Sequence, residues 1–399
     1  MATLLLALFC SVGQSPTPAL DAHLKQLEAK DVQTRRDGAE NLNFLFHNHV
    51  DLPGEKVTRP LLKALRDPDA EVRWQVVCVF CKFNQAYKPA IPILAGMLRD
   101  DKDVDTRAEA AYALLKFASA AKDELPTLKE AKKQDDKHVR LYAGGAVARL
   151  EPEDENALRF VLQFLKDGDK DVRSSALDVF TFLGVRTIPA LKGGLNDKNT
   201  EVRVWTIKAI MATRAYRSED AKFPLDVIPL LIKAIDDEDR GVAYQAIYAV
   251  ELLGPRGKGA IPALVRRFKD PKWQMRYTAI DSLEAFGSAS DAATPGLKEA
   301  LKDEHESVRT AAERALRSID EAKKKPARRK RPRSHRNRSG RIGWLLSGTT
   351  RSTLSHPAAR PGVRVGGRAN AALVFNTSVG KNARRSWSPR RPVELHRNK

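Results

Sequence analysis

The sequence predicts an all-α protein, an α-solenoid of about nine two-helix repeats. Two columns of residues recur along the 399-residue chain in a fixed relation to each other. An Arg returns after 30 to 40 residues, and a Pro precedes it by 13 to 15 residues in most repeats. Self-similarity at such a period is typical of helical repeat arrays, in which neighbouring repeats share one continuous core. The Arg column contains Arg36, Arg73, Arg107, Arg140, Arg173, Arg203, Arg276 and Arg309, with Ala243 in one position, and the Pro column contains Pro60, Pro92, Pro126, Pro189, Pro229, Pro262 and Pro295.

The Pro marks the start of the first helix of each repeat. Proline suits the first helical turn, because its φ is fixed near the helical value and its missing N–H has no partner there. Segments such as "IPLLIKAIDD" from Ile228 and "IPALVRRFKD" from Ile261 then carry apolar residues at helical spacing. We therefore expect one helix to begin at each Pro.

An Asp lies six residues before the Arg in most repeats and predicts the turn between the two helices. Asp favours such turns, and its charge near the start of the next helix is stabilised by the helix dipole. In the second helix, the residues one before, three after and seven after the Arg share one face. Val172, Ala176 and Phe180 are an example. This face is the predicted core.

The Asp and Arg columns predict a ladder of ion pairs that links stacked repeats. The predicted ladder consists of Asp67, Arg73, Asp101, Arg107, Arg140, Asp167, Arg173, Asp197, Arg203, Asp270, Arg276, Asp303 and Arg309. Lys30 and Gln134 replace the Asp in two repeats. An exposed ion pair contributes about 0–1 kcal/mol, whereas a buried Val, Leu or Phe contributes roughly 1.5–3 kcal/mol. We therefore expect the ladder to set register more than stability, and the gap at Ala243 to be tolerated.

Over residues 20–321 the chain resembles the HEAT repeats, especially their bacterial lyase-like branch. The resemblance rests on two helices per repeat, the Pro of the first helix, and a turn such as "DGDKDVRSSA" from Asp167 that leads into the second. It implies an α-solenoid whose second helices line the concave side. It does not specify a function, because the relatives include scaffolds, adaptors, chromophore lyases and a metal hydroxylase.

The positive charge of the chain lies in its C-terminal part. The whole sequence has 70 Lys+Arg and 50 Asp+Glu, a net charge of +20. Residues 323–399 contain 22 Lys+Arg and one acid, Glu394, which leaves 48 bases and 49 acids in residues 1–322. Since such a stretch cannot bury enough apolar surface to fold, we expect a disordered, Arg-rich tail over residues 322–399.

The tail has three interpretations that the sequence leaves open. It can be an electrostatic arm for nucleic acid, another polyanion or a membrane surface, or in a eukaryotic cell a nuclear import signal. It can be solvated charge without a partner. Because Asp and Glu almost vanish after Lys323, it can also be an out-of-frame translation of GC-rich DNA.

Residues 1–19 have features of a secretory signal peptide. An apolar run from Leu4 to Val12 is followed by small residues, although no Lys or Arg precedes it. A buried or frayed first helix is the alternative. We expect an exported protein, periplasmic or secreted, if the signal is real, and a cytoplasmic one otherwise. No other stretch of the sequence is long and apolar enough to span a membrane.

The sequence predicts no catalytic site, no cofactor and no metal. Cys78 and Cys81 form a C-x-x-C in the apolar helical stretch "VVCVFCKF", where we expect packed thiols, and no second pair completes a zinc site. The HEAT-like hydroxylase needs several His-Glu pairs, and in this solenoid only His305–Glu306 occurs. We therefore expect a non-enzymatic protein and keep a lyase-like HEAT enzyme as a second alternative.

Aromatic residues recur on the second helices, on the side away from the predicted core. They lie one, two or five residues after the Arg position and are Trp74, Tyr112, Tyr142, Trp205, Tyr244, Tyr248 and Tyr277. Aromatic side chains with a polar tip are favoured at interaction surfaces. We predict a scaffold or adaptor that binds a protein or peptide along the concave face. Binding of nucleic acid or a polyanion through the tail is the alternative.

Overall fold

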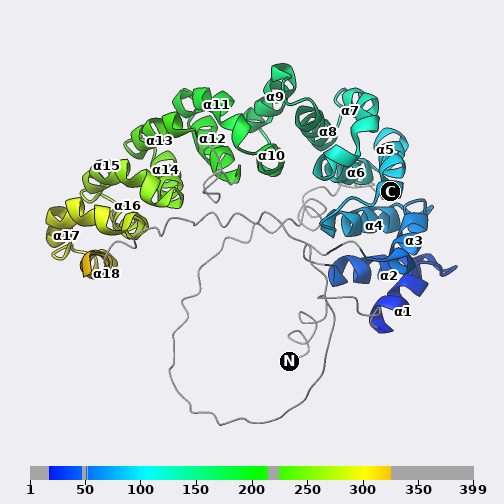
Figure 1. Cartoon of the computed structure of the whole chain (residues 1–399), viewed down its shortest axis with the longest axis horizontal. Helices are drawn as coiled ribbons and strands as arrows, with labels where there is room; N and C mark the ends of the chain where they lie inside the picture. Colours follow the sequence, from blue (N-terminus) through cyan, green and yellow to red (C-terminus); the bar gives the residue numbers. More distant parts are fainter. Residues whose placement is uncertain (1–17, 47–50, 52, 214–223, 325–399) are drawn as a thin grey trace, which may run out of the picture. The chain divides into compact units, whose positions relative to one another are not determined.

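The computed structural model describes residues 18–46, 51, 53–213 and 224–324. Within these residues the chain forms nine consecutive helix pairs (Figure 1), which confirms the predicted all-α repeat architecture. The first helices of the pairs are α1 (Pro18–Gln26), α3 (Glu55–Ala64), α5 (Ile91–Asp100), α7 (Leu125–Ala131), α9 (Glu155–Leu162), α11 (Ile188–Leu191), α13 (Ile228–Ile235), α15 (Ile261–Arg267) and α17 (Thr294–Ala300). The second helices are α2 (Val32–Leu45), α4 (Ala70–Lys82), α6 (Val104–Lys116), α8 (Lys137–Leu150), α10 (Lys170–Leu183), α12 (Thr200–Ala212), α14 (Arg240–Leu252), α16 (Trp273–Asp281) and α18 (Glu306–Lys324).

The helices form two layers. Each second helix packs against the second helices before and after it, from α2 on α4 through to α16 on α18. First helices pack against the second helix of their own pair, as α5 does on α6 and α13 on α14. They also contact one another, as α5 does α7 and α13 does α15. The core is therefore shared between neighbouring repeats, as expected for a solenoid.

The predicted core face of the second helices is confirmed. In α10, Val172, Ala176 and Phe180 are at most 1% exposed. The corresponding residues of the eighth repeat are Met275 and Ala279 in α16 and Leu283 just after it, and they are at most 5% exposed. Each buried Val, Met, Leu or Phe among them stabilises the fold by roughly 1.5–3 kcal/mol.

Two side chains, rather than one, hold the turn before a second helix. Before α4, Asp67 accepts a hydrogen bond from the main-chain N–H of Asp69 at 2.9 Å. Asp69 is the N-cap of α4 and accepts the N–H of Val72 at 3.2 Å. The same arrangement recurs at Asp101 and Asp103 and at Asp237 and Asp239. The second helix is thus capped by the residue two positions after the Asp of the predicted ladder, and not by that Asp itself.

The predicted position of the Pro is confirmed in six first helices and differs in one. It occupies one of the first two positions of the helix at Pro92, Pro126, Pro189, Pro229, Pro262 and Pro295. Pro60 instead lies inside α3. That helix starts earlier, because Gly54 caps it and accepts the N–H groups of Val57 and Thr58.

Two predicted segments fall almost wholly outside the described residues. Helix α1 begins at Pro18, next to the end of the predicted signal segment 1–19, and α18 ends at Lys324, next to the start of the predicted tail 322–399. The signal peptide and the disordered tail therefore stay predictions. In the part of the chain that the structure describes, no helix is long and apolar enough to cross a membrane.

The core assignment predicts a large difference between two apolar truncations. Phe180→Ala should lower the free energy of unfolding by about 3–5 kcal/mol, because the side chain is fully buried. Leu225→Ala, at a residue that is 65% exposed, should change it by no more than about 0.5 kcal/mol. Urea unfolding of both variants measures this difference, and the reverse order would mean that the buried face is misassigned.

Candidate functional site

The ladder arginine of a second helix joins the turn of its own repeat to the turn of the next one. Arg73 Nη1 donates to the main-chain oxygen of Asp67 at 2.8 Å, in its own turn. Its Nε and Nη2 each donate to the carboxylate of Asp101 at 2.7 Å, in the next turn. The same geometry recurs at Arg203 with Asp197 and Asp237, and at Arg276 with Asp270 and Asp303. A bidentate pair of this kind adds geometric specificity to its energy.

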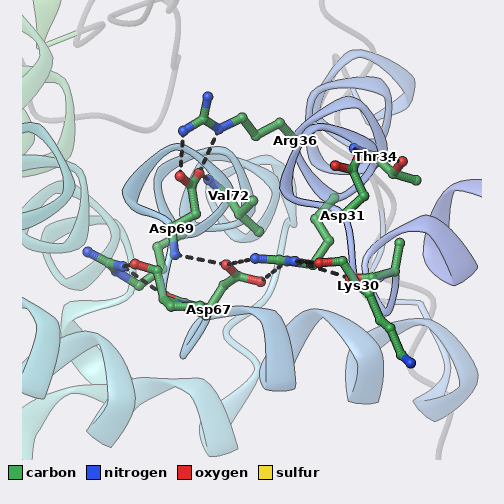
Figure 2. Close-up of polar contacts among 11 residues, drawn as sticks. Lys30, Asp31, Thr34, Arg36, Asp67, Asp69 and Val72 are labelled. Carbon is green, nitrogen blue, oxygen red and sulfur yellow. Dashed lines mark hydrogen bonds and ion pairs between the residues drawn. The ribbon is translucent and has the colours of Figure 1, made fainter.

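In the first repeat the ladder residue is Arg35, so the prediction of Arg36 is wrong by one position. Arg35 donates to the main-chain oxygens of Ala29 and Lys30 and binds Asp67 at 2.7 Å. Arg36 binds both carboxylate oxygens of Asp69 instead (Figure 2). The sequence could not separate the two arginines, because neither has an Asp six residues before it.

Gln134 occupies an Asp position and keeps the ladder continuous without a charge. Its side-chain oxygen accepts from Arg107 Nε at 3.0 Å, and its amide nitrogen donates to the main-chain oxygen of Leu98 at 2.9 Å. The neutral amide therefore bonds in both directions, to the second helix of the preceding repeat and to its first helix.

Two other predicted ladder pairs, Arg140 with Asp167 and Arg173 with Asp197, are replaced by other partners. Asp167 pairs with Lys137 at 2.8 Å, while Arg140 donates to main-chain oxygens of its own turn. Arg173 forms an ion pair with Glu201 at 2.7 Å, and Asp197 forms one with Lys166 at 2.8 Å. Lys137 and Glu201 lie near the starts of α8 and α12. At these interfaces longer side chains beside the ladder position replace the predicted pair.

The gap at Ala243 is filled by an arginine from a different helix. Arg267, the last residue of α15, donates from Nη2 to the main-chain oxygen of Asp237 at 2.7 Å. This is the oxygen that a ladder arginine at position 243 would reach. Arg267 Nη1 also donates to Asp270 at 3.1 Å. The sequence predicts that the gap at Ala243 is tolerated, and in the structure Arg267 binds both groups that the missing pair would join, the main-chain oxygen of Asp237 and the carboxylate of Asp270.

The ladder is largely buried, so the expectation of exposed ion pairs is wrong. The side chains of Arg73 and Asp101 are 14% and 4% exposed, and those of Arg276 and Asp303 are 8% and 11% exposed. The hydrogen bond to Asp101 raises the pKa of Arg73 above its ordinary value. Removing one partner of a buried pair leaves an uncompensated charge, which costs far more than the loss of an exposed pair.

Only one of the seven predicted contact aromatics is well exposed. Tyr244 in α14 is 49% exposed. Tyr112, Tyr248 and Tyr277 are half-buried, and Trp74, Tyr142 and Trp205 are at most 8% exposed. The last three belong to the core, so the prediction that they contact a partner is corrected. Three of the remaining four, Tyr244, Tyr248 and Tyr277, lie in the contacting helices α14 and α16 and are called the tyrosine surface below.

Neighbouring second helices cover the buried aromatics. A Cβ atom at Gly145 in α8 would lie 2.5 Å from Val179 Cγ1 in α10, so these two helices approach closely. Tyr142, also in α8, packs edge-on against Tyr112 of α6, with ring centroids 5.3 Å apart. A second helix is thus covered from both sides as well as from its first helix, and only a narrow part of its surface is left to solvent.

Three carboxylates lie beside the tyrosine surface. Arg314 of α18 binds both Asp281 and Glu284, the latter at 2.9 Å. Glu251, at the end of α14, has its pKa raised to about 7, first by burial and then by the charges of Asp281 and Glu284. Burial also raises the pKa of Asp281.

Cys78 and Cys81 are packed thiols, as predicted. Both are 7% exposed, and burial raises the pKa of each well above its ordinary value. Glu109 of α6, 6% exposed, is hydrogen-bonded to both thiols, and its own pKa is raised by burial. A thiol that stays protonated is a poor nucleophile and metal ligand. Among the described residues, no group of three or more His, Cys, Asp or Glu is arranged to hold a metal ion.

A protein-family model matches two parts of the chain. The family model described as HEAT repeats matches residues 58–149 and 228–317. Both matched segments consist of the helix pairs described above. A comparison with curated protein sequences found no match.

Several solved structures are similar to this chain at low sequence identity. Kap121p has 16% identity over 78% of this chain and 38% of its own, with a TM-score of 0.45. Kap95p, from a study of its binding to RanGDP, has 14% identity over 76% of this chain and 47% of its own, with a TM-score of 0.49. The CpcE and CpcF complex of phycocyanin lyase from Nostoc sp. PCC7120 has 21% identity over 41% of this chain and 99% of that one, with a TM-score of 0.34. This chain thus spans less than half the length of the two Kap proteins.

Because Arg267 fills the gap at Ala243, two adjacent arginines, Arg266 and Arg267, should differ in their contribution to the free energy of unfolding. Arg267→Ala should lower the free energy of unfolding by about 2–4 kcal/mol, because it leaves Asp270 and two main-chain oxygens without this donor. Arg266→Ala removes a pair with Asp236 whose side chains are 58% and 41% exposed, and should cost no more than about 1 kcal/mol. Equal costs in urea unfolding would show that Arg267 does not replace the ladder residue.

The raised pKa of Glu251 predicts a pH-dependent effect of neutralising it. Its folded pKa of about 7 lies above its ordinary value of 4.5, so the stability that its protonated form contributes is lost as pH rises between these values. Glu251→Gln should match the wild type in free energy of unfolding at pH 4.5 and exceed it by about 1–2 kcal/mol at pH 8. Glu155→Gln, at an exposed residue of α9, is the control. A Glu251→Gln effect that does not change with pH would contradict the assignment.

Proposed function

Since the chain is an α-solenoid of HEAT repeats, we propose that it is a non-enzymatic scaffold that binds a protein or peptide on its layer of second helices. The tyrosine surface is the proposed contact. The observation that carries the proposal is the exposure of Tyr244, which leaves 49% of a large aromatic residue in solvent beside two half-buried tyrosines.

The chemistry of tyrosine supports a contact role. Its ring adds a large apolar area, its hydroxyl group can bond to a partner or to water, and only two side-chain torsions lose freedom on binding. Aromatic residues are enriched at protein interfaces for these reasons. The core aromatics Tyr142 and Trp205 are not available for such a contact, because their side chains are already buried against neighbouring helices.

The ladder supports the proposal by fixing the helices that carry these tyrosines. Arg203 and Arg267 bind the turn before α14, and Arg276 joins the turn before α16 to the turn before α18. A surface held on rigid elements is pre-organised, so less entropy is lost when a partner binds.

Photo-cross-linking at position 244 tests the contact directly. The full chain, with p-benzoylphenylalanine in place of Tyr244, is irradiated in the cells that produce it. Discrete adducts with a partner protein are expected from position 244. They should be absent from the matched control at Leu225, which is 65% exposed but lies at the entrance to a first helix. Equal adducts at both positions would remove the tyrosine surface as the site.

Mutation of the tyrosines then separates binding from folding. Tyr244→Ala combined with Tyr277→Ala should weaken binding of the cross-linked partner by about 2 kcal/mol, roughly 30-fold. The melting temperature should fall far less than in Trp205→Ala, which truncates a core residue at a cost of about 3–5 kcal/mol. Unchanged affinity in a folded double variant would contradict the proposal.

Polyanion binding through residues 323–399 is a second candidate function, favoured by the charge of that stretch. It contains 22 Lys+Arg and a single acid. Binding by neutralised phosphates weakens steeply with salt, because counterions are released. Affinity for duplex DNA that falls steeply between 50 and 200 mM salt, as expected for about six or more phosphate contacts, and is lost on deletion of residues 323–399, would support it. Binding that survives the deletion would exclude it.

A further inference from the structure

We propose that the basic groups around Trp205, on helices α10 and α12, form a binding site for an acidic side chain of the partner protein. The members of this site, called the cationic site below, are Lys170, Arg173, Trp205 and Lys208. The inference rests on the proposed function in that the occupant belongs to a protein or peptide partner. It adds a second contact point and the charge that the partner presents there.

Arg173 has a hydrogen-bond donor without an acceptor. The regular ladder arginines donate from both Nε and Nη2 to one carboxylate of the next turn. At Arg173 that carboxylate, Asp197, is bound by Lys166 instead. Arg173 Nη2 forms an ion pair with Glu201 at 2.7 Å, and its Nε is buried with no acceptor in the part of the chain that the structure describes. Buried donors are nearly always paired, so this one indicates a missing acceptor.

Glu201 is a weak occupant of the place beside Arg173. The side chain of Arg173 is 10% exposed, whereas that of Glu201 is 64% exposed. A largely exposed carboxylate is solvated and adds little to such a pair, so it is easily displaced. Once Glu201 moves aside, a carboxylate of a partner can accept from both Nε and Nη2, which is the bidentate geometry of the regular pairs. An acidic side chain of a partner therefore satisfies Arg173 better than Glu201 does.

Two cationic groups lie over the ring of Trp205. The guanidinium carbon of Arg173 is 5.2 Å from the ring centroid, and Lys208 Nζ is 4.4 Å from it. Among the described residues, neither Lys170 nor Lys208 forms an ion pair with a carboxylate. Burial, and then the charges of Lys170 and Arg173, lower the pKa of Lys208. The basic groups thus repel one another, and a bound anion relieves that repulsion.

The cationic site lies on the same face of the second-helix layer as the tyrosine surface. Lys208 follows the ladder residue Arg203 by five positions, and Tyr248 follows position 243 by five. Helix α12, which carries Lys208, packs against α14, which carries Tyr244 and Tyr248. Equivalent positions of neighbouring repeats face the same way, because the repeats stack in register. A partner on the tyrosine surface can therefore place an acidic side chain beside Lys208.

The chemistry of the site favours an acidic protein segment over a nucleic acid. Nucleic acids bind through rows of phosphates and through bases stacked on exposed aromatic rings. The ring of Trp205 is only 6% exposed, so no base can stack on it. The acceptors that the regular ladder arginines use are carboxylates, as is the present partner of Arg173. We therefore expect Asp or Glu of a partner as the occupant.

Fluorine NMR of the full chain, with fluorotryptophan at its five Trp positions, tests the site. The Trp205 resonance is the one missing from Trp205→Phe. The probe is a capped tetraglutamate peptide, added in excess so that the basic residues 323–399 do not deplete it. We expect a saturable shift of the Trp205 resonance with this peptide and none with capped tetraglutamine. An equal shift with tetraglutamine, or no saturable shift with tetraglutamate, would overturn the inference.

Single substitutions identify the groups that bind the probe. Lys208→Gln should weaken binding, measured at the Trp205 resonance, by about fivefold, because one attractive charge is lost. Glu201→Gln should strengthen it by about threefold, because the competing carboxylate is removed. Lys298→Gln, at an exposed lysine of α17, is the matched control and should have no effect. Unchanged binding in Lys208→Gln, with helices intact by circular dichroism, or weaker binding in Glu201→Gln would contradict the assignment.

Inorganic phosphate distinguishes an acidic side chain from a free anion as the occupant. The same titration is repeated with phosphate in place of the peptide. Weaker binding of phosphate than of tetraglutamate is expected, because the peptide also presents carboxylates to Lys170 and Lys208. Tighter binding of phosphate would assign the site to a phosphate group and overturn the inference.

The inference and the proposed function fail in different ways. If the Trp205 resonance does not respond to tetraglutamate but position 244 still captures a partner, only the inference falls. If the Trp205 resonance responds as expected and position 244 yields no partner adduct, the cationic site stands and the proposed tyrosine contact falls.

Discussion

Most repeat interfaces in the described part of this protein depend on a guanidinium group that is bound on two sides. One side binds a main-chain oxygen of a turn, and the other binds a carboxylate of the next turn, as Arg73 does with Asp67 and Asp101. The apolar core between the layers contributes more stabilising free energy than these pairs, but hydrophobic burial is non-directional. The arginine supplies the direction, since a bidentate pair is satisfied in one relative position of two repeats.

The constraint acts on the position of the guanidinium group and not on the residue number that supplies it. Arg267 shows this most clearly, because it reaches the main-chain oxygen of Asp237 from the first helix of the next repeat. Arg35 meets the same requirement one position before the regular column, and at Gln134 a neutral amide oxygen replaces the carboxylate that accepts from the arginine. A repeat protein can therefore lose a residue from its sequence pattern and keep the interaction in space.

The same register decides the chemistry of the second-helix layer. It aligns α14, α16 and α18 so that burial, and then the charges of Asp281 and Glu284, raise the pKa of Glu251 to about 7. It also presses α8 and α10 together at Gly145, which leaves Tyr142 in the core. The proposed contact surface therefore lies in α14 and α16, where Tyr244 is 49% exposed and Tyr248 and Tyr277 are half-buried.

The sequence by itself determined the repeat, the two helices in it and the buried face of the second helix. These follow from local rules, since helical spacing places Val172, Ala176 and Phe180 on one side whatever the neighbours are. It also predicted seven aromatic positions away from this core, of which three, Trp74, Tyr142 and Trp205, are buried. Only the tertiary structure decided which of them solvent can reach, because that depends on how closely adjacent helices approach. It likewise decided that Arg267 replaces the residue missing at Ala243 and that Glu251 joins Asp281 and Glu284. Such pairings join residues about 30 apart in the chain, and no local spacing rule encodes a distance between different helices.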